Sequence, residues 1–485
     1  MRVLNQPARL AGAPRTVRII GFLACMAALS LLLAGCGGGS TSSSGSSGSN
    51  TRALTILTNS LPNNSSLPAA TTGVNYDVTL QAAGGTPPYT WSVASGTLPS
   101  WAKLDASTGN ISGIPDATGQ TQLTLKVTDS GSPAASATLS VTLTASASPD
   151  DAKLTGIYAL ASYDFNGDYK SSTDYEGTFN TAVLDGSGVC SDTQILNVAG
   201  TISNSSLPCT YSVASNDTMV FTVSGEPGTV TGATDSAGDT LVLSQITAPW
   251  NPTILVGVNQ EQTGTNADLN GAYMLVSYDS NGEVNNGPAS EGNLLTITFD
   301  GAGNCSGSGQ HNFMSAISTM SVTCTYSVAS DGSLTLTSGG QTDNGAVGTG
   351  GNVIILSQVT PTLNPTIVVA VKPMQSANDA DLTGTYTLVT YDNNGDIGGN
   401  PAYEGGLITL DFDGAGNCSG NELHNLAGTV SNESISCTYS VATDGSLSLT
   451  TGGQTLNGAL GTSGNVIVLS QITPGLNPTV VVGVK

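Results

Sequence analysis

The chain has 485 residues and a formal net charge of −23, although only 9% of its residues are charged. So acidic a surface repels nucleic acid and anionic lipid head groups, and nucleic acid is therefore excluded as a partner. Gly, Ser, Thr, Asn and Val are abundant, a composition typical of an all-β fold with many turns.

The amino-terminal segment predicts export. Four arginines with no acidic residue precede the apolar run IIGFLACMAALSLLLAG, which is typical of a secretory signal peptide. The run is close to the shortest length that spans a bilayer, so an uncleaved anchor is the alternative interpretation. The sequence LAGC that ends at Cys36 resembles the lipobox of bacterial lipoprotein precursors. This resemblance implies that residues 1–35 are removed and that Cys36 carries a lipid holding the chain to the cell envelope, with Gly37 favouring the outer membrane.

Residues 36–51 are rich in Gly and Ser, a composition that behaves as flexible coil. We predict that they form a tether between the lipid and the folded part. Without the four arginines of the signal, seven basic residues face 34 acidic ones, so the exported chain is more acidic still.

Residues 52–148 predict one domain of short strands. Alternating stretches such as YTWSV and LTLKVTD are separated by Gly- and Pro-rich turns, which is typical of a β-sandwich. The segments GGTPPYTW (84–91), LPSWAKLDASTGNISGIP (98–115) and VTDSGSP (127–133) resemble the He-PIG immunoglobulin-like family, a relative of cadherin-like domains. The resemblance implies an immunoglobulin-like sandwich with Trp91 in its core.

The same resemblance raises Ca²⁺ as the one candidate cofactor. Asp105 and Asp129 stand where cadherin-like domains carry acidic residues, and Asp150 and Asp151 lie at the junction with the next domain. The acidic and asparagine-rich run that ends a calcium-binding cadherin repeat is missing, so a domain without a metal stays open.

The rest of the chain repeats itself three times, over residues 152–262, 266–376 and 380–485. The copies open with LTGIYALASYDFNGD, LNGAYMLVSYDSNGE and LTGTYTLVTYDNNGD, and a period this long indicates tandem domains. Each copy contains about eight short alternating stretches joined by hairpin turns. This pattern predicts an eight-stranded up-and-down β-barrel or a closely related sandwich in each copy.

Six cysteines fall two per repeat, with the same separation of 19 residues in each. In an exported protein such pairs predict disulfides, on neighbouring antiparallel strands where the Cβ atoms come close. Zinc is not favoured because the clustered ligands of a zinc site do not occur. The predicted bridges are Cys190–Cys209, Cys305–Cys324 and Cys418–Cys437.

Four sets of acidic residues recur at equivalent positions. Carboxylates without basic partners in their own module suit a hard cation. Asp, Asn and Gly are also ordinary turn residues, and we predict that these positions form turns. The sets are Asp164, Asp279 and Asp392; Asp168, Glu283 and Asp396; Glu176, Glu291 and Glu404; and Asp185, Asp300 and Asp413.

The sequence favours binding over catalysis. The two histidines, His311 and His424, are equivalent, but the first repeat has Leu196 there and no nucleophile or base motif accompanies them, which predicts exposed loop histidines. The leading hypothesis is a non-catalytic envelope lipoprotein for surface display or adhesion, binding an unknown protein or glycan. The alternative is a small-molecule or glycan-binding protein using the barrels, which requires them to be hollow. An envelope enzyme is the least supported hypothesis.

Overall fold

A computed structural model describes residues 53–57, 66–115, 117–165, 175–225, 228–284, 287–393 and 403–485, with backbone alone at 165, 280–284, 287–289 and 393. The predicted signal, the tether and Cys36 lie outside the described residues, as do Asp168, Asp396 and the side chain of Glu283. Within the described part of the chain, no helix has the length and apolar character needed to cross a membrane.

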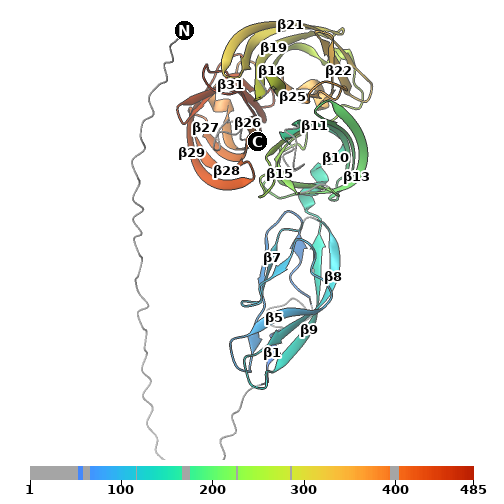
Figure 1. The fold of residues 1–485 in the computed structure, drawn as a ribbon, viewed down its shortest axis with the longest axis vertical. Coiled ribbons are helices and arrows are strands. Elements are labelled where there is room, and N and C mark those ends of the chain that lie inside the picture. The colour runs from blue at the N-terminus through green and yellow to red at the C-terminus, as the bar shows by residue number, and fades with distance from the viewer. Residues whose placement is uncertain are drawn as a thin grey trace, which may run out of the picture. The chain divides into compact units, whose positions relative to one another are not determined.

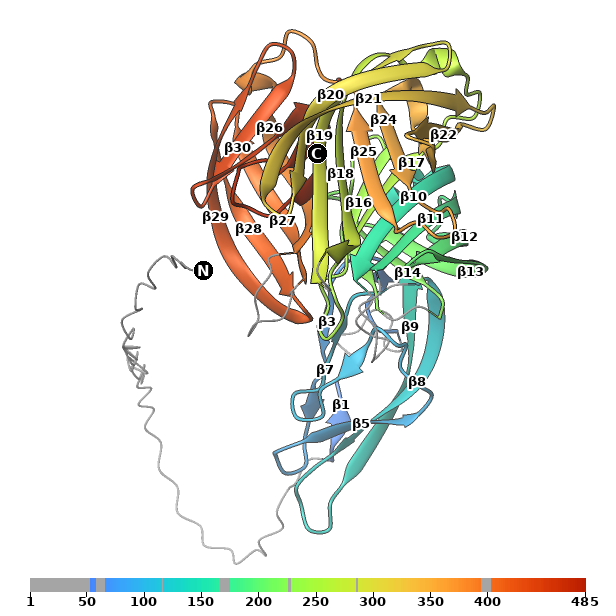
Figure 2. The same cartoon turned by 45° about the horizontal axis from the view of Figure 1, so that its top comes forward.

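The first domain is an immunoglobulin-like sandwich (Figures 1 and 2). A four-stranded sheet in the order β2-β9-β8-β5 faces a three-stranded sheet, β3-β7-β6, and β1 pairs with β4. Trp91 on β5 is only 4% exposed and belongs to the core, as the sequence predicts. The strands are β1 Thr55–Ile56, β2 Ala70–Thr71, β3 Tyr76–Thr79, β4 Ala82–Ala83, β5 Thr90–Ser95, β6 Lys103–Leu104, β7 Asn110–Gly113, β8 Gly119–Thr128 and β9 Ser136–Ser146.

Each of the three repeats is a closed eight-stranded antiparallel barrel. Every strand pairs with its neighbour in sequence, and the last strand pairs with the first, which decides for a barrel over a sandwich. In Figure 1 the first barrel is green, the second yellow and the third orange to red.

The first barrel comprises β10 Thr155–Phe165, β11 Tyr175–Asp185, β12 Val189–Val198, β13 Thr201–Val213, β14 Thr218–Val223, β15 Val230–Thr234, β16 Thr240–Ser244 and β17 Thr253–Asn259. The second comprises β18 Asn270–Val284, β19 Gly287–Asp300, β20 Asn304–Phe313, β21 Ala316–Val328, β22 Ser333–Ser338, β23 Gln341–Val347, β24 Val353–Ser357 and β25 Thr366–Val371. The third comprises β26 Thr383–Asn393, β27 Tyr403–Asp413, β28 Asn417–Leu426, β29 Thr429–Val441, β30 Ser446–Thr451, β31 Gln454–Leu460, β32 Val466–Ser470 and β33 Thr479–Val484. Short 3₁₀ turns are η2 Pro149–Lys153, η3 Asn266–Asp268, η4 Thr349–Gly351 and η5 Asp379–Asp381.

The barrels curve sharply at an equivalent glycine in each copy. A Cβ placed on Gly345 in β23 would lie 2.0 Å from the carbonyl oxygen of Ile355 in β24, and the corresponding distance is 1.8 Å at Gly232 and Gly458. Only glycine permits so close an approach between neighbouring strands, which is how a small sheet turns a corner and closes.

All three predicted disulfides are present. In each barrel the two cysteines are register partners on neighbouring strands, as for Cys305 on β20 and Cys324 on β21. The other bridges are Cys190–Cys209 and Cys418–Cys437.

The barrels share a hydrophobic core in addition to their own interiors. Tyr163, Tyr278 and Tyr391 are fully buried, and their rings meet edge to face with centroids 5.3–5.4 Å apart. Edge-to-face rings at this separation attract each other in addition to excluding water. The shared core also contains valines from all three barrels.

Three equivalent buried asparagines connect the barrels in a closed cycle. Each donates two hydrogen bonds from Nδ2 to backbone carbonyls that precede the last strand of the next barrel. Because the third barrel returns to the first, the head-to-tail contact closes as it does in a cyclic trimer. The pairs are Asn197 with Gln358 and Leu363 (2.8 and 3.0 Å), Asn312 with Gln471 and Leu476 (2.9 and 3.0 Å), and Asn425 with Gln245 and Trp250 (3.1 and 3.0 Å).

Candidate functional site

The inward face of the second barrel changes from apolar to acidic along each strand. On β18, Tyr273, Leu275, Ser277 and Asp279 alternate with residues that face the shared core, such as Tyr278. Because side chains of a strand alternate between its two faces, this one sequence supplies a closed apolar end and a polar end to the same interior.

Aromatic side chains close the apolar end of this barrel. The ring of Phe299 contacts those of Tyr273 and Tyr326 edge to face, with centroids 5.3 and 5.0 Å apart. The hydroxyl of Tyr326 donates to the carbonyl oxygens of Asn266 and Leu269, which fastens the 3₁₀ turn η3 over this end. The interior is therefore a cup with an aromatic floor.

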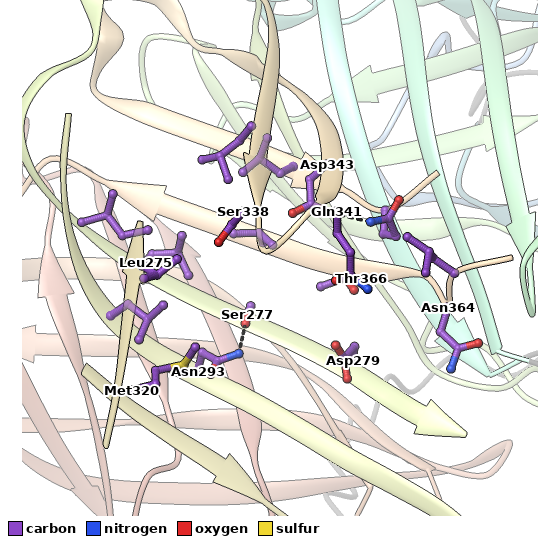
Figure 3. A pocket seen from close by; sticks show the side chains of 18 of the residues that line it. Leu275, Ser277, Asp279, Asn293, Met320, Ser338, Gln341, Asp343, Asn364 and Thr366 are labelled. Carbon is purple, nitrogen blue, oxygen red and sulfur yellow. Dashed lines mark hydrogen bonds between the residues drawn. The ribbon is translucent and has the colours of Figure 1, made fainter. Parts of the chain in front are cut away.

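A cavity of about 410 Å³ lies above this floor. Its wall is apolar, with contributions from Leu295, Val322, Leu336 and Val368, and its rim is polar (Figure 3). The volume lies within the range of small-molecule sites. The rim residues are Ser277, Asp279, Asn293, Gln341, Asp343, Gln358, Asn364 and Thr366.

Strand β20 of the second barrel carries glycines where the first barrel has polar side chains. Gly307 and Gly309 on β20 occupy positions that carry Asp192 and Gln194 in the first barrel. In the first barrel Asp192 is buried and accepts a hydrogen bond from Nδ2 of Asn180 at 3.0 Å. The second barrel has Leu295 at the position of Asn180. The first barrel therefore has a buried polar pair at positions where the second has glycine and leucine.

Asp279 is the chemically most unusual residue of the rim. Its Oδ1 atom is buried and has no hydrogen-bond partner among the described residues. Burial raises the pKa of Asp279 well above its usual value, the charges of Glu291 and Asp343 raise it further, and a hydrogen bond from Thr366 acts in the opposite direction. The surroundings of this carboxyl group therefore favour its protonated form.

Two further groups complete the acidic rim. Burial raises the pKa of Asp343 to about 6, and its Oδ1 accepts a hydrogen bond from Gln358 at 3.0 Å. Glu291, the register partner of Asp279, lies with its Oε1 atom 3.3 Å from Nδ1 of His311. Nδ1 of His311 is also 3.0 Å from Oδ1 of Asn293.

The prediction of exposed loop histidines is wrong. His311 lies within β20 and His424 within β28, and their side chains are only 22% and 18% exposed. In each case the strand continues through the histidine, which pairs in register with Asn293 on β19 or Gly406 on β27. Nε2 of His424 lies 2.6 Å from Oε1 of Glu404, and this contact raises the pKa of His424.

The turn prediction is correct for one acidic set and wrong for two. Asp300 accepts hydrogen bonds from the backbone of Ala302 and Asn304, as expected of a turn residue, and Asp185 and Asp413 make equivalent contacts. The other two sets lie within strands and pair across the first two strands of each barrel. These pairs are Asp164 with Glu176, Asp279 with Glu291 and Asp392 with Glu404.

In the immunoglobulin-like domain the proposed calcium ligands are occupied by protein donors. Asp105 accepts from the backbone of Ser107 and Thr108, which lowers its pKa to about 2, and Asp129 accepts from three backbone N–H groups. Asp150 pairs with Lys153 at 3.3 Å. The described residues include no group of three or more His, Cys, Asp or Glu side chains arranged to hold a metal ion.

Asp151 has a structural role that recurs in every barrel. Its buried Oδ1 accepts from the backbone N–H of Val213 at 2.6 Å. The second repeat places Asn266 at this position with the same contact to Val328, and the third places Asp379. Since an uncharged amide does the same work, this position needs an acceptor and not a charge. Calcium binding at Asp105, Asp129, Asp150 and Asp151 remains a prediction that the geometry does not support.

These features define the class of protein: an immunoglobulin-like domain followed by three eight-stranded barrels that share one core. Residues 54–146 match the family model He_PIG, described as "Putative Ig domain". No curated protein sequence matches the chain.

Two solved structures show weak likeness to the chain. One is the isotype 1 transferrin binding protein B from serogroup B Neisseria meningitidis, 12% identical over 64% of this chain and 65% of that one, with a TM-score of 0.20. The other is the protocadherin GammaB4 extracellular domain, 11% identical over 76% of this chain and 64% of that one, with a TM-score of 0.12. The chain thus spans about two thirds of either protein. At such TM-scores neither likeness bears on fold or function.

Proposed function

We propose that this protein is an exported, lipid-anchored and non-catalytic binding protein whose second barrel holds a small, largely apolar ligand. The observation that carries the proposal is the cavity of about 410 Å³ with an apolar wall and a polar rim. Sites for small molecules have this composition, since apolar area supplies affinity and a few polar groups fix orientation.

The repeats themselves support a role for the interior. Residues that hold the barrels together recur in all three copies, as for the tyrosines of the shared core and the asparagines that link neighbouring barrels. Residues at matched interior positions differ, as for Gln194, Gly309 and Glu422. Barrels that keep the same assembly contacts but differ in their interior residues are suited to bind different ligands.

The export and lipid anchor belong to the proposal because they rest on the amino-terminal sequence. Surface display or adhesion stays a prediction, since no described feature identifies a protein or glycan partner. The non-catalytic role is likewise part of the proposal, and it rests on the sequence, which shows no motif pairing a histidine with a nucleophile or base.

The test is titration of the mature chain with N-phenyl-1-naphthylamine, a neutral fluorophore that brightens when it leaves water. We expect saturable binding with one site per chain. Val322→Trp fills the cavity from β21 and should abolish the brightening. Ile435→Trp makes the same change at the matched position of the third barrel and should leave it intact.

A circular-dichroism melting curve establishes that each variant is folded. Met320→Trp, on the same wall, serves if Val322→Trp does not fold. Binding that is absent in the wild type, or unchanged in a folded cavity-filling variant, would refute the proposal.

A further inference from the structure

The rim of the second barrel contains an acceptor for which the described residues offer no donor. Oδ1 of Asp279 is buried and lacks a hydrogen-bond partner there, and the residue lines the cavity. A buried carboxyl oxygen without a partner loses its hydration on folding and gains nothing in return. A ligand that enters the cavity can supply the missing donor.

The acidic residues around Asp279 favour a positively charged donor. Glu291 faces it from β19 and Asp343 from β23, and both carboxylates act on it electrostatically. His311 contacts Glu291 from β20, and Thr366 donates from β25. Three carboxyl groups and one histidine therefore surround the polar end of the cavity.

The module lacks a cation of its own at this end. Lys372 is its single basic residue between 266 and 376, and the ammonium group lies 5.9 Å over the ring of Tyr273, at the floor of the barrel. Asp279 lies at the other end of the same strand, β18. Apart from His311, which contacts Glu291, a cation at the rim must therefore come from outside this module.

We propose that the ligand of the second barrel is an amphiphilic cation, an ammonium group attached to an apolar chain or ring. The ammonium group lies at the rim, where it donates to Oδ1 of Asp279, and the apolar part fills the cavity above the aromatic floor. This inference rests on the proposed function and narrows it to one class of ligand. Anionic amphiphiles are disfavoured because the rim would repel them.

Protonation gives the site a characteristic signature. Burial raises the pKa of Asp279 in the free barrel, while a bound ammonium group lowers it by stabilising the carboxylate. Binding of the cation therefore releases a proton from the rim, whereas a neutral ligand of the same length releases none. This difference separates a charge-specific site from an apolar one.

The experiment is isothermal titration calorimetry of the mature chain with octylamine, octan-1-ol and octanoate at pH 7.5. We expect octylammonium to bind at least tenfold more tightly than octanol, with octanoate the weakest. The heat of octylammonium binding should depend on the ionisation enthalpy of the buffer, because a proton is released. Val322→Trp should remove binding of all three compounds.

Asp279→Asn isolates the charge. It should weaken octylammonium at least tenfold, change octanol less than twofold, and abolish the dependence on the buffer. The matched Asp392→Asn in the third barrel should change neither compound.

The outcomes separate the two proposals. If octanol or octanoate binds as tightly as octylammonium at a site that Val322→Trp removes, the cationic class is wrong and the binding function stands. The class is equally refuted if Asp279→Asn leaves octylammonium unaffected, or if the neutral fluorophore binds and no octyl compound does. If neither the fluorophore nor any octyl compound binds, both proposals fall.

Discussion

The outward and inward faces of the barrels differ in how faithfully they repeat. On the face toward the shared core, Tyr163, Tyr278 and Tyr391 make the same edge-to-face contacts in every copy. On the inward face, the positions beside the cavity of the second barrel carry different residues in each copy. The equivalent sets are Thr178, Asn293 and Gly406, and Asn180, Leu295 and Ile408.

The contrast between the two faces indicates that, within each strand, the residues that assemble the barrels are distinct from the residues that line the interior. A strand presents alternate residues to its two faces, so the outer set can be held fixed while the inner set changes. A glycine that recurs in each repeat shows why residues on the outward face cannot change. A Cβ on Gly292 would lie 2.6 Å from Cβ of Pro478 in the next barrel, and Gly177 and Gly405 meet their prolines at 2.5 Å.

Removing one ring from the shared core should have the largest effect. Tyr391 is fully buried between the other two tyrosines, and Tyr391→Ala should destabilise the protein by about 3–5 kcal/mol, as for other large-to-small core changes. Urea denaturation measures this loss.

Tyr391→Phe is the matched control. The hydroxyl of Tyr391 is buried without a hydrogen-bond partner among the described residues, so its removal should be neutral or slightly stabilising. A loss of several kcal/mol in Tyr391→Phe would show that the hydroxyl, and not the ring, holds the core together.

The disulfide of the second barrel should contribute less to stability than the ring of Tyr391. Replacing Cys305 and Cys324 by alanine opens a loop of 19 residues, and the expected cost is about 3 kcal/mol. The same change at Cys418 and Cys437 should cost a similar amount, since the two bridges are equivalent in register. Only the change in the second barrel should also weaken binding of the fluorophore. Equal weakening by both double variants would contradict a site confined to the second barrel.

The asparagine hydrogen bonds between neighbouring barrels should have the next largest effect on stability. Asn312→Ala removes both hydrogen bonds to the carbonyls of Gln471 and Leu476 and should cost about 1–3 kcal/mol, because those carbonyls lose their buried partner. Asn304→Ala, at the exposed first residue of β20 in the same barrel, is the control and should cost less. Thermal melting of the two variants decides, and an equal shift would argue against the cycle as a stabilising feature.

Much of this organisation is predictable from the sequence. The strands of each barrel follow from alternating stretches and hairpin turns, because both signals are local. The bridge between Cys305 and Cys324 follows from a spacing that repeats. The core position of Trp91 follows from the He-PIG resemblance.

The site was harder to predict because the same residues serve two roles. Asp279 and its neighbours have turn propensity, yet they continue the alternation of Tyr273, Leu275 and Ser277 into the barrel. That alternation was the available signal. The cyclic contacts of Asn312 join residues about 160 positions apart, and no local pattern carries such information.

The smallest expected effect concerns the acidic pair of the third barrel. Burial and the charge of Glu404 raise the pKa of Asp392 from 3.8 to about 8, Glu422 adds to the rise, and Thr479 and His424 oppose it. Between these two pH values the folded protein binds a proton that the unfolded chain releases. The stabilisation is complete below pH 3.8 and is lost as pH rises through about 8.

Asp392→Asn should remove this dependence. Between pH 5 and pH 6 the wild type should lose stability relative to the variant by on the order of 1 kcal/mol, because the two states differ by about one bound proton over this one pH unit. Asp413→Asn is the control, because turn hydrogen bonds lower the pKa of Asp413 and place its titration below this range. Urea midpoints at the two pH values measure the difference. If Asp392→Asn keeps the wild-type slope, then Asp392 is ionised in the folded barrel, and the comparison between protonated interior acids and charged turn acids fails.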